Sequence, residues 1–242
     1  MAVLWALAAF LMTLIGGLVA MRVRDRRHLV LGLAGGLILG VVAFDLVPGS
    51  LDITSSTVLG VPSPMLAFAA GFLLLHIVEQ AAAIHRAHEG EYAPHRHAHG
   101  RTGLLAASAL VGHSFIDGLS IGLGFQSGAE TGAFVALAVI AHDFADGFNT
   151  VTAASLGRSG RPALVMLLLD AVAPIFGALA TLLVDVPEGV LGPYLGFFAG
   201  VLLYLAAAEI LPEAHSQHPR VLTLCCTLAG VLAVMLIVGT AE

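Results

Sequence analysis

Eight apolar segments of about 20 residues each restrict this chain of 242 residues to a membrane-spanning fold. They fall at residues 2–21, 29–48, 58–83, 102–124, 131–156, 162–184, 188–210 and 220–240. In lipid, backbone N–H and C=O groups must be bonded inside the chain, and segments of this length achieve that as α-helices. Only 11% of the residues are charged, against about 25% in soluble domains. We therefore predict an all-α polytopic membrane protein, a single domain over residues 1–242 surrounded by membrane lipid.

The connections between these segments alternate in charge. All ten basic residues are arginines, and they occupy every second connection: Arg22, Arg24, Arg26, Arg27, Arg86, Arg96, Arg101, Arg158, Arg161 and Arg220. The other connections and the C-terminus carry only acids: Asp52, Glu130, Asp185, Glu188 and Glu242. The positive-inside rule then predicts cytoplasmic arginines and both termini outside, with the first segment an uncleaved span.

The composition also bears on the membrane in which the protein resides and on its binding partners. Arginines scattered over short loops, with no lysine, do not form the basic patch of a nucleic-acid-binding protein. The richness in Ala, Gly and Leu and the lack of lysine favour a bacterial inner (plasma) membrane. The glycines of the second segment are compatible with a homodimer, because small residues let helices approach closely.

Two copies of His-x-x-x-Asp-Gly lie in the middle of the fourth and fifth segments, at His113–Gly118 and His142–Gly147. Residues four apart share one helix face, so each copy presents an imidazole and a carboxylate together. The short connection makes the two helices antiparallel neighbours. Each Asp at mid-membrane costs about 2.5–3.5 kcal/mol on insertion scales, which calls for a functional reason. We predict that His113, Asp117, His142 and Asp146 form a primary site for a divalent transition metal.

Three further polar residues extend this prediction. Ser114 and Asp143 lie about 100° around their helices from the primary cluster. Asp170 lies in the sixth segment, one turn before the helix-distorting Pro174. We expect Ser114, Asp143 and Asp170 to form a secondary metal site or an exit path.

The predicted cytoplasmic loop over residues 84–101 is rich in histidine: His85, His88, His95, His97 and His99. Such a tract can collect soft divalent metals, and it can equally serve as a solvated linker. The sequence leaves both interpretations open.

The chain also contains an internal similarity between segments that run in opposite directions. The two His-x-x-x-Asp-Gly copies form one matching pair. The stretch from Gly35 to Asp45-Leu-Val-Pro48 matches the stretch from Gly200 to Glu209-Ile-Leu-Pro212, with a one-residue difference in spacing. Inverted repeats with a site at the membrane midplane are typical of transporters, and we predict such repeats here.

With these features in place, the sequence resembles the ZIP (Zrt/Irt-like) family of divalent metal transporters. The resemblance rests on the eight spans, the His-rich third connection, the motifs of the fourth and fifth segments, and the Glu209–His215 ending of the seventh. The family's fourth-helix pattern falls on His113, Ser114 and Asp117, with Ser114 in place of the usual Asn. Its fifth-helix pattern falls on His142, Asp143, Ala145 and Asp146, with Ala145 in place of Pro. Where the family often has a Glu that helps to hold a second ion, this chain has Ala173.

The resemblance implies a ZIP-like helix bundle that carries divalent metal toward the cytoplasm, with the metal as substrate, no separate cofactor and no enzymatic activity. Zinc is the first expectation, and iron, manganese and cadmium follow. An intramembrane zinc-dependent hydrolase is the alternative, although the fifth-helix motif lacks the second His of a His-Glu-x-x-His enzyme. A haem protein with His113 and His142 as axial ligands would leave both Asp residues without a role.

Overall fold

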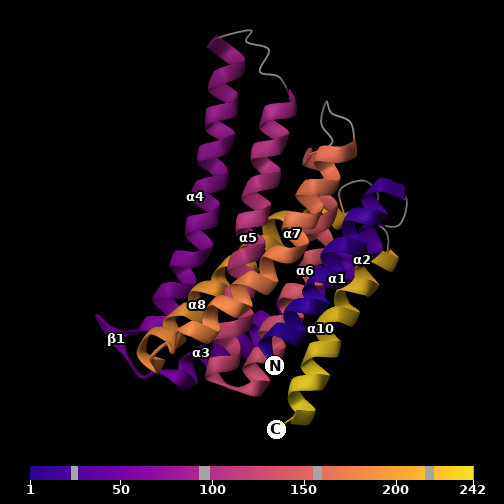
Figure 1. Cartoon of the computed structure of the whole chain (residues 1–242). Coiled ribbons are helices and arrows are strands. Elements are labelled where there is room, and N and C mark those ends of the chain that lie inside the picture. The colour runs from indigo at the N-terminus through magenta and orange to yellow at the C-terminus, as the bar shows by residue number, and fades with distance from the viewer. Residues whose placement is uncertain (23–26, 93–98, 155–159, 216–220, 242) are drawn as a thin grey trace.

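The computed structural model describes residues 1–22, 27–92, 99–154, 160–215 and 221–241, and nearly all of them are helical (Figure 1). The long helices are α1 (Ala2–Arg22), α2 (Arg27–Val41), α4 (Ser63–Tyr92), α5 (His99–Ser127), α6 (Ala129–Ala154), α7 (Gly160–Ala180), α8 (Glu188–Tyr204) and α10 (Val221–Ala241). The short elements are η1 (Val42–Leu46), α3 (Val47–Ile53), β1 (Thr57–Val58), β2 (Val61–Pro62), η2 (Thr181–Leu183), η3 (Leu205–Ile210) and α9 (Leu211–His215).

Within the described residues, seven helical segments are long and apolar enough to cross a membrane. They are Ala2–Met21, His28–Ile53, Ser63–Ala81, Ala129–Val151, Arg161–Leu183, Gly189–His215 and Val221–Thr240. The remaining long helix, α5, carries His113, Ser114, Asp117 and Ser120, which lower its hydropathy. The expectation of an all-α polytopic membrane protein is confirmed.

The ends of the helices are sorted between the two ends of the molecule. The two chain termini lie at one end, and the helix ends that adjoin the arginine-bearing connections lie at the other (Figure 1). The predicted third span was wrong at its start, because a small hairpin (Thr57 opposite Pro62) occupies the first residues of 58–83. Leu59 (φ 54°) and Gly60 (φ 80°) form its turn, and this backbone conformation stops a helix from forming before Ser63.

Glycines bring four pairs of helices into backbone contact. A side chain at Gly16 would meet the carbonyl of Phe144, and one at Gly147 would meet that of Thr13, which fixes α1 against α6. Reciprocal pairs of the same kind join α5 to α7 (Gly118, Gly177), α2 to α10 (Gly36, Gly230) and α4 to α8 (Gly71, Gly200). Without a hydrophobic force between helices in lipid, such close packing is the main source of helix association.

These pairs assemble into two groups of helices. We name α1, α5, α6, α7 and η2 the site bundle, and α2, η1, α3, α4, α8, η3, α9 and α10 the companion bundle. The two groups meet where α2 packs on α6 and α5 packs on α8. Glycines in the described part of the chain make close contacts only within one bundle. Where a side chain added at such a glycine would collide with another helix, that helix belongs to the same bundle. Each bundle is therefore tightly packed within itself.

The glycine-rich face of α2 packs against α10 of the same chain. Gly32, Gly36 and Gly40 face Thr223, Thr227 and Val234 of α10. This face is consequently covered and does not supply the surface for a second copy that the glycine pattern suggested.

Two π-helical turns widen the companion bundle at matching places. The turn η1 contains Asp45 and the turn η3 contains Glu209, and each acid is followed three residues later by a proline. The amide of Val47 bonds to the carbonyl of Val42, and that of Leu211 to Ala206, so each bond spans five residues. Proline removes a helical N–H and displaces the preceding turn, which accounts for both irregularities.

Gly36→Ala should lower the melting temperature of the detergent-purified protein. The added methyl group would strike the Thr227 carbonyl, and overpacking of this kind costs about 1–3 kcal/mol. Gly239→Ala is the matched control, because nothing lies within 4 Å of that position on α10. Equal melting temperatures for the two variants would contradict the packing role of Gly36.

Candidate metal centre

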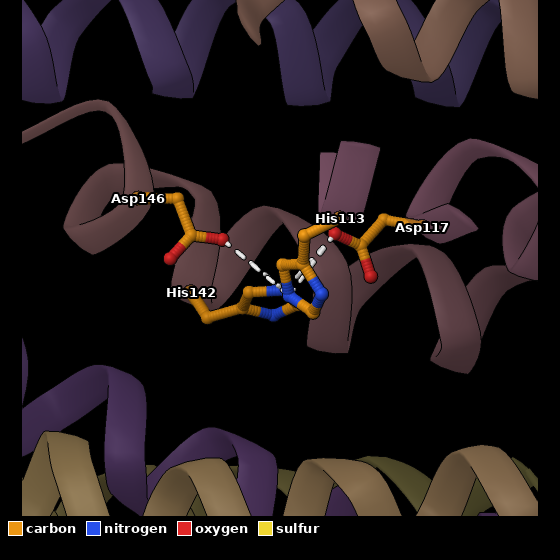
Figure 2. A group of neighbouring side chains, drawn as sticks. All are labelled: His113, Asp117, His142 and Asp146. Carbon is orange, nitrogen blue, oxygen red and sulfur yellow. Dashed lines mark ion pairs between the residues drawn. The ribbon is translucent and has the colours of Figure 1, made fainter. Parts of the chain in front are cut away.

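The four residues of the two repeated motifs meet at one point between α5 and α6. Helix α5 contributes His113 and Asp117, and helix α6 contributes His142 and Asp146. The side chains converge from the two helices (Figure 2). One ligand atom from each of the four lies within 4.8 Å of the others. The i, i+4 spacing thus places the residues as the sequence predicts.

The nitrogen-to-oxygen distances within this cluster are nearly equal. His113 Nε2 lies 3.5 Å from Asp117 Oδ2 and 3.8 Å from Asp146 Oδ2. His142 Nε2 lies 3.5 Å and 3.7 Å from the same two oxygens. A tetrahedral zinc site with bonds of about 2.0–2.2 Å has ligand atoms ~3.4 Å apart. The four atoms are therefore spaced for one small cation between them and lie too far apart for good direct hydrogen bonds.

Burial makes this arrangement costly without a cation. The side chains of Asp117 and His142 are 0% and 1% exposed, and those of Asp146 and His113 are 12% and 23% exposed. Within the described part of the chain, five buried atoms of the cluster lack a hydrogen-bond partner: both carboxylate oxygens of Asp117, Asp146 Oδ2, His113 Nε2 and His142 Nε2. Each unsatisfied buried polar group costs about 1–3 kcal/mol, and more when it is charged. A divalent cation would satisfy these atoms and balance the two carboxylate charges.

A hydrogen bond to the backbone fixes the orientation of the His142 ring. Its Nδ1 lies 2.8 Å from the carbonyl oxygen of Ala138, one turn earlier on α6. A carbonyl only accepts, so Nδ1 carries the proton and Nε2 presents its lone pair to the cluster. Metal-binding histidines generally have such a partner on the second ring nitrogen.

Ser114 and Asp170 lie beside the cluster and are bound to each other. Asp170 Oδ1 accepts a hydrogen bond of 2.6 Å from Ser114, and Oδ2 accepts one of 2.8 Å from Thr150. This buried carboxylate therefore ties α5, α6 and α7 together one turn before Pro174. Its role as a metal ligand or exit residue stays a prediction.

Asp143 is the other buried acid next to the cluster. It is 0% exposed, and neither carboxylate oxygen has a hydrogen-bond partner among the described residues. It directly follows His142 on α6 and precedes Asp146 by three residues. Of the three predicted secondary residues, Asp143 is thus the one with free oxygens near the four-residue cluster.

A cavity of about 370 Å³ opens directly onto the cluster. His142 and Asp146 form part of its wall, and it continues past Asn149 toward Glu209 and Glu213 at the end of η3 and in α9. It therefore extends from the cluster toward the end of the molecule where the arginine-bearing connections begin. Three acids along one passage suit a cation.

Sequence reasoning did not foresee this cavity. Glu209 stood out through the internal similarity and the family resemblance, and Glu213 only through the resemblance; neither placed them on a cavity beside the cluster. The pairing of a π-helical turn with each acid depends on hydrogen bonding that spacing alone does not reveal. The side chains of the predicted His-rich loop over residues 84–101 lie outside the described residues, although α4 continues to Tyr92 and α5 begins at His99.

Comparison with models of known protein families identifies a match over much of the chain. Residues 84–238, more than half of the chain, match the family model described as ZIP Zinc transporter. The matched region contains all four residues of the cluster. No curated protein matches the chain.

Asp117→Asn should weaken Zn²⁺ binding to the purified protein more than about 10-fold, because it removes a buried negative charge that faces both histidines. Isothermal titration calorimetry measures the affinity, and elemental analysis measures the zinc content per chain. Asp52→Asn, at an exposed position on α3, is the matched control and should bind as the unsubstituted protein does. Equal affinity in the two variants would place the zinc elsewhere.

Proposed function

Because the chain belongs to the ZIP zinc transporter family, we propose that it carries divalent transition-metal cations across a membrane toward the cytoplasm through the cluster of His113, Asp117, His142 and Asp146. The observation that carries this proposal is a buried set of four free ligand atoms that opens onto a cavity lined by acids. The metal is the transported substrate. The family match is to transporters, and it lends no support to the alternative of a zinc-dependent hydrolase.

The ligand set favours zinc among the candidate ions. Two imidazole nitrogens and two carboxylate oxygens at near-tetrahedral spacing suit Zn²⁺ best, with Fe²⁺, Mn²⁺ and Cd²⁺ as further substrates. The absence of a thiolate ligand in the cluster suits an ion that must leave again, because Cys ligands hold zinc more tightly. Two Asp residues neutralise the 2+ charge, which offsets the cost of an ion at the centre of a membrane.

The charge of the connections supports transport toward the cytoplasm. The cavity extends toward the end with the arginine-bearing connections, which the positive-inside rule assigns to the cytoplasm. In this orientation both termini are outside, and metal leaves the cluster past Glu209 and Glu213. Asp143 and Asp170 form a secondary site or part of the path beside it.

The arrangement of helices supports inverted repeats and an eighth span. The pairing of α1 with α6 matches that of α7 with α5, and the pairing of α2 with α10 matches that of α8 with α4. Asp45 and Glu209 occupy matching π-helical turns. In this scheme α5 and α6 are equivalent, so α5 crosses the membrane as α6 does. Release follows when the site bundle rocks against the companion bundle.

Proteoliposomes that contain the protein should take up Zn²⁺, and His142→Ala combined with Asp146→Ala should reduce uptake to the level of empty liposomes. The two changes remove two of the four candidate ligands, and these are the two that line the cavity. Offering Fe²⁺, Mn²⁺ and Cd²⁺ separately ranks the ions. Full uptake by the double variant, at equal protein content, would rule out transport through this cluster.

Glu209→Gln should slow Zn²⁺ uptake several-fold while leaving the affinity of the cluster nearly unchanged. Glu209 lines the cavity and is not one of the four ligands, so its charge would act on the passage of the cation. Asp185→Asn, at an exposed position between α7 and α8, is the control. A change in affinity without a change in rate would argue against this role.

A further inference from the structure

The cluster is open on one side, and a hydrogen bond between the two bundles lies on the other. Ser120 follows Asp117 by one turn on α5, away from the arginine-bearing end of the helix, and is fully buried. Its Oγ lies 2.6 Å from the hydroxyl of Tyr194, which is half-buried on α8. This contact therefore adjoins the metal ligands on the side opposite the cavity.

The Tyr194 hydroxyl is the donor in this hydrogen bond, and Ser120 Oγ is the acceptor. Ser120 Oγ donates to the carbonyl of Ile116 at 2.9 Å, one turn earlier on its own helix. Ser120 has only one hydroxyl proton, so Tyr194 donates to Ser120 Oγ. If the helices separate, the phenol loses its acceptor, whereas Ser120 keeps its own bond. The contact can thus break without leaving a buried serine unsatisfied.

The Ser120–Tyr194 hydrogen bond joins the two bundles, whereas the following polar contacts each lie within one bundle. The bonds of Ser114 and Thr150 to Asp170 lie within the site bundle. The bond from Tyr204 to Glu79 joins α8 to α4 within the companion bundle. The close glycine contacts also stay within one bundle each. The Ser120–Tyr194 bond crosses the boundary along which the two bundles must move for transport.

We propose that the Ser120–Tyr194 hydrogen bond is a latch that keeps the outer side of the metal cluster closed while the cavity side is open. The inference rests on the proposed function, because it assigns the bond to one of two states of a transporter. Opening to the outside requires α5 to move away from α8 and the latch to break. Loss of the latch should therefore increase the population of the outward-open state.

A buried reporter cysteine tests the latch without metal. Val139→Cys places a thiol one turn before His142 on α6, on the outer side of the cluster, at a position that is 0% exposed. The reporter is built in a chain with Cys225→Ala and Cys226→Ala, so that it is the only thiol. The rate of maleimide labelling of the detergent-purified protein then reports how often this side opens.

Tyr194→Phe should raise the labelling rate about 2- to 10-fold, the shift expected from loss of one neutral hydrogen bond. Ser120→Ala should have the same effect, and the two changes together should add little to either one. Tyr204→Phe is the matched control: it removes a phenol on the same helix that bonds within the companion bundle, and it should leave the rate unchanged.

A second reporter separates opening from general loosening. Val234→Cys lies in α10, is also 0% exposed and is packed inside the companion bundle. The latch is overturned if Tyr194→Phe leaves the Val139→Cys rate unchanged, or if it accelerates labelling at both reporters equally. Failure of the proposed function would appear separately, as absence of Zn²⁺ uptake by the unsubstituted protein, because the labelling assay involves no transport.

Discussion

The structure depends on how two buried carboxylates and two imidazoles are stabilised in the middle of an apolar helix bundle. In a low-dielectric interior, unpaired ligand atoms raise the energy of the fold, and a cation placed between them lowers it. The direct nitrogen-to-oxygen distances of 3.5–3.8 Å show that the side chains do not satisfy one another. The same spacing allows one small divalent ion to contact all four. The buried, unpaired ligand atoms are thus the feature on which the proposed transport depends.

Close helix packing holds this cluster in place. Glycines fix α5 against α7 and α1 against α6, and Asp170 joins three of these helices through Ser114 and Thr150. The ligands are therefore carried by one compact bundle. The companion bundle supplies the acid Glu209 to the cavity and Tyr194 to the closed side. A site held by one bundle and enclosed by the other is suited to exposure first on one side and then on the other.

The two π-helical turns relate this design to the internal similarity of the chain. Each turn is caused by the proline that comes shortly after it in the sequence, and each contains one acidic residue. Asp45 lies at the end of α2 away from the arginine-bearing connections, and Glu209 lies on the cavity near the opposite end. Helix irregularities of this type are frequent at functional sites, because they redirect side chains and free carbonyl groups.

The sequence by itself determined the helical class and predicted the four residues that meet in the cluster. Segment length and hydropathy suffice for membrane helices, and an i, i+4 repeat suffices to place His113 with Asp117 and His142 with Asp146 on one helix face each. These are local properties, set by the 1.5 Å rise and 3.6-residue period of the helix. The hairpin before α4 was missed because positive φ angles at Leu59 and Gly60 override the apolar composition of that stretch.

Only the tertiary structure decided which helices pair, and therefore what lies around the ligands. Ser114 and Asp170 are 56 residues apart, and Ser120 and Tyr194 are 74 apart, so no spacing rule connects them. The glycines of α2 suggested a surface for a second copy, but α10 occupies it. The cavity arises where α2, α6, η3 and α9 meet. Contacts between distant segments depend on how whole helices pack, and the local periods of the sequence do not encode that packing.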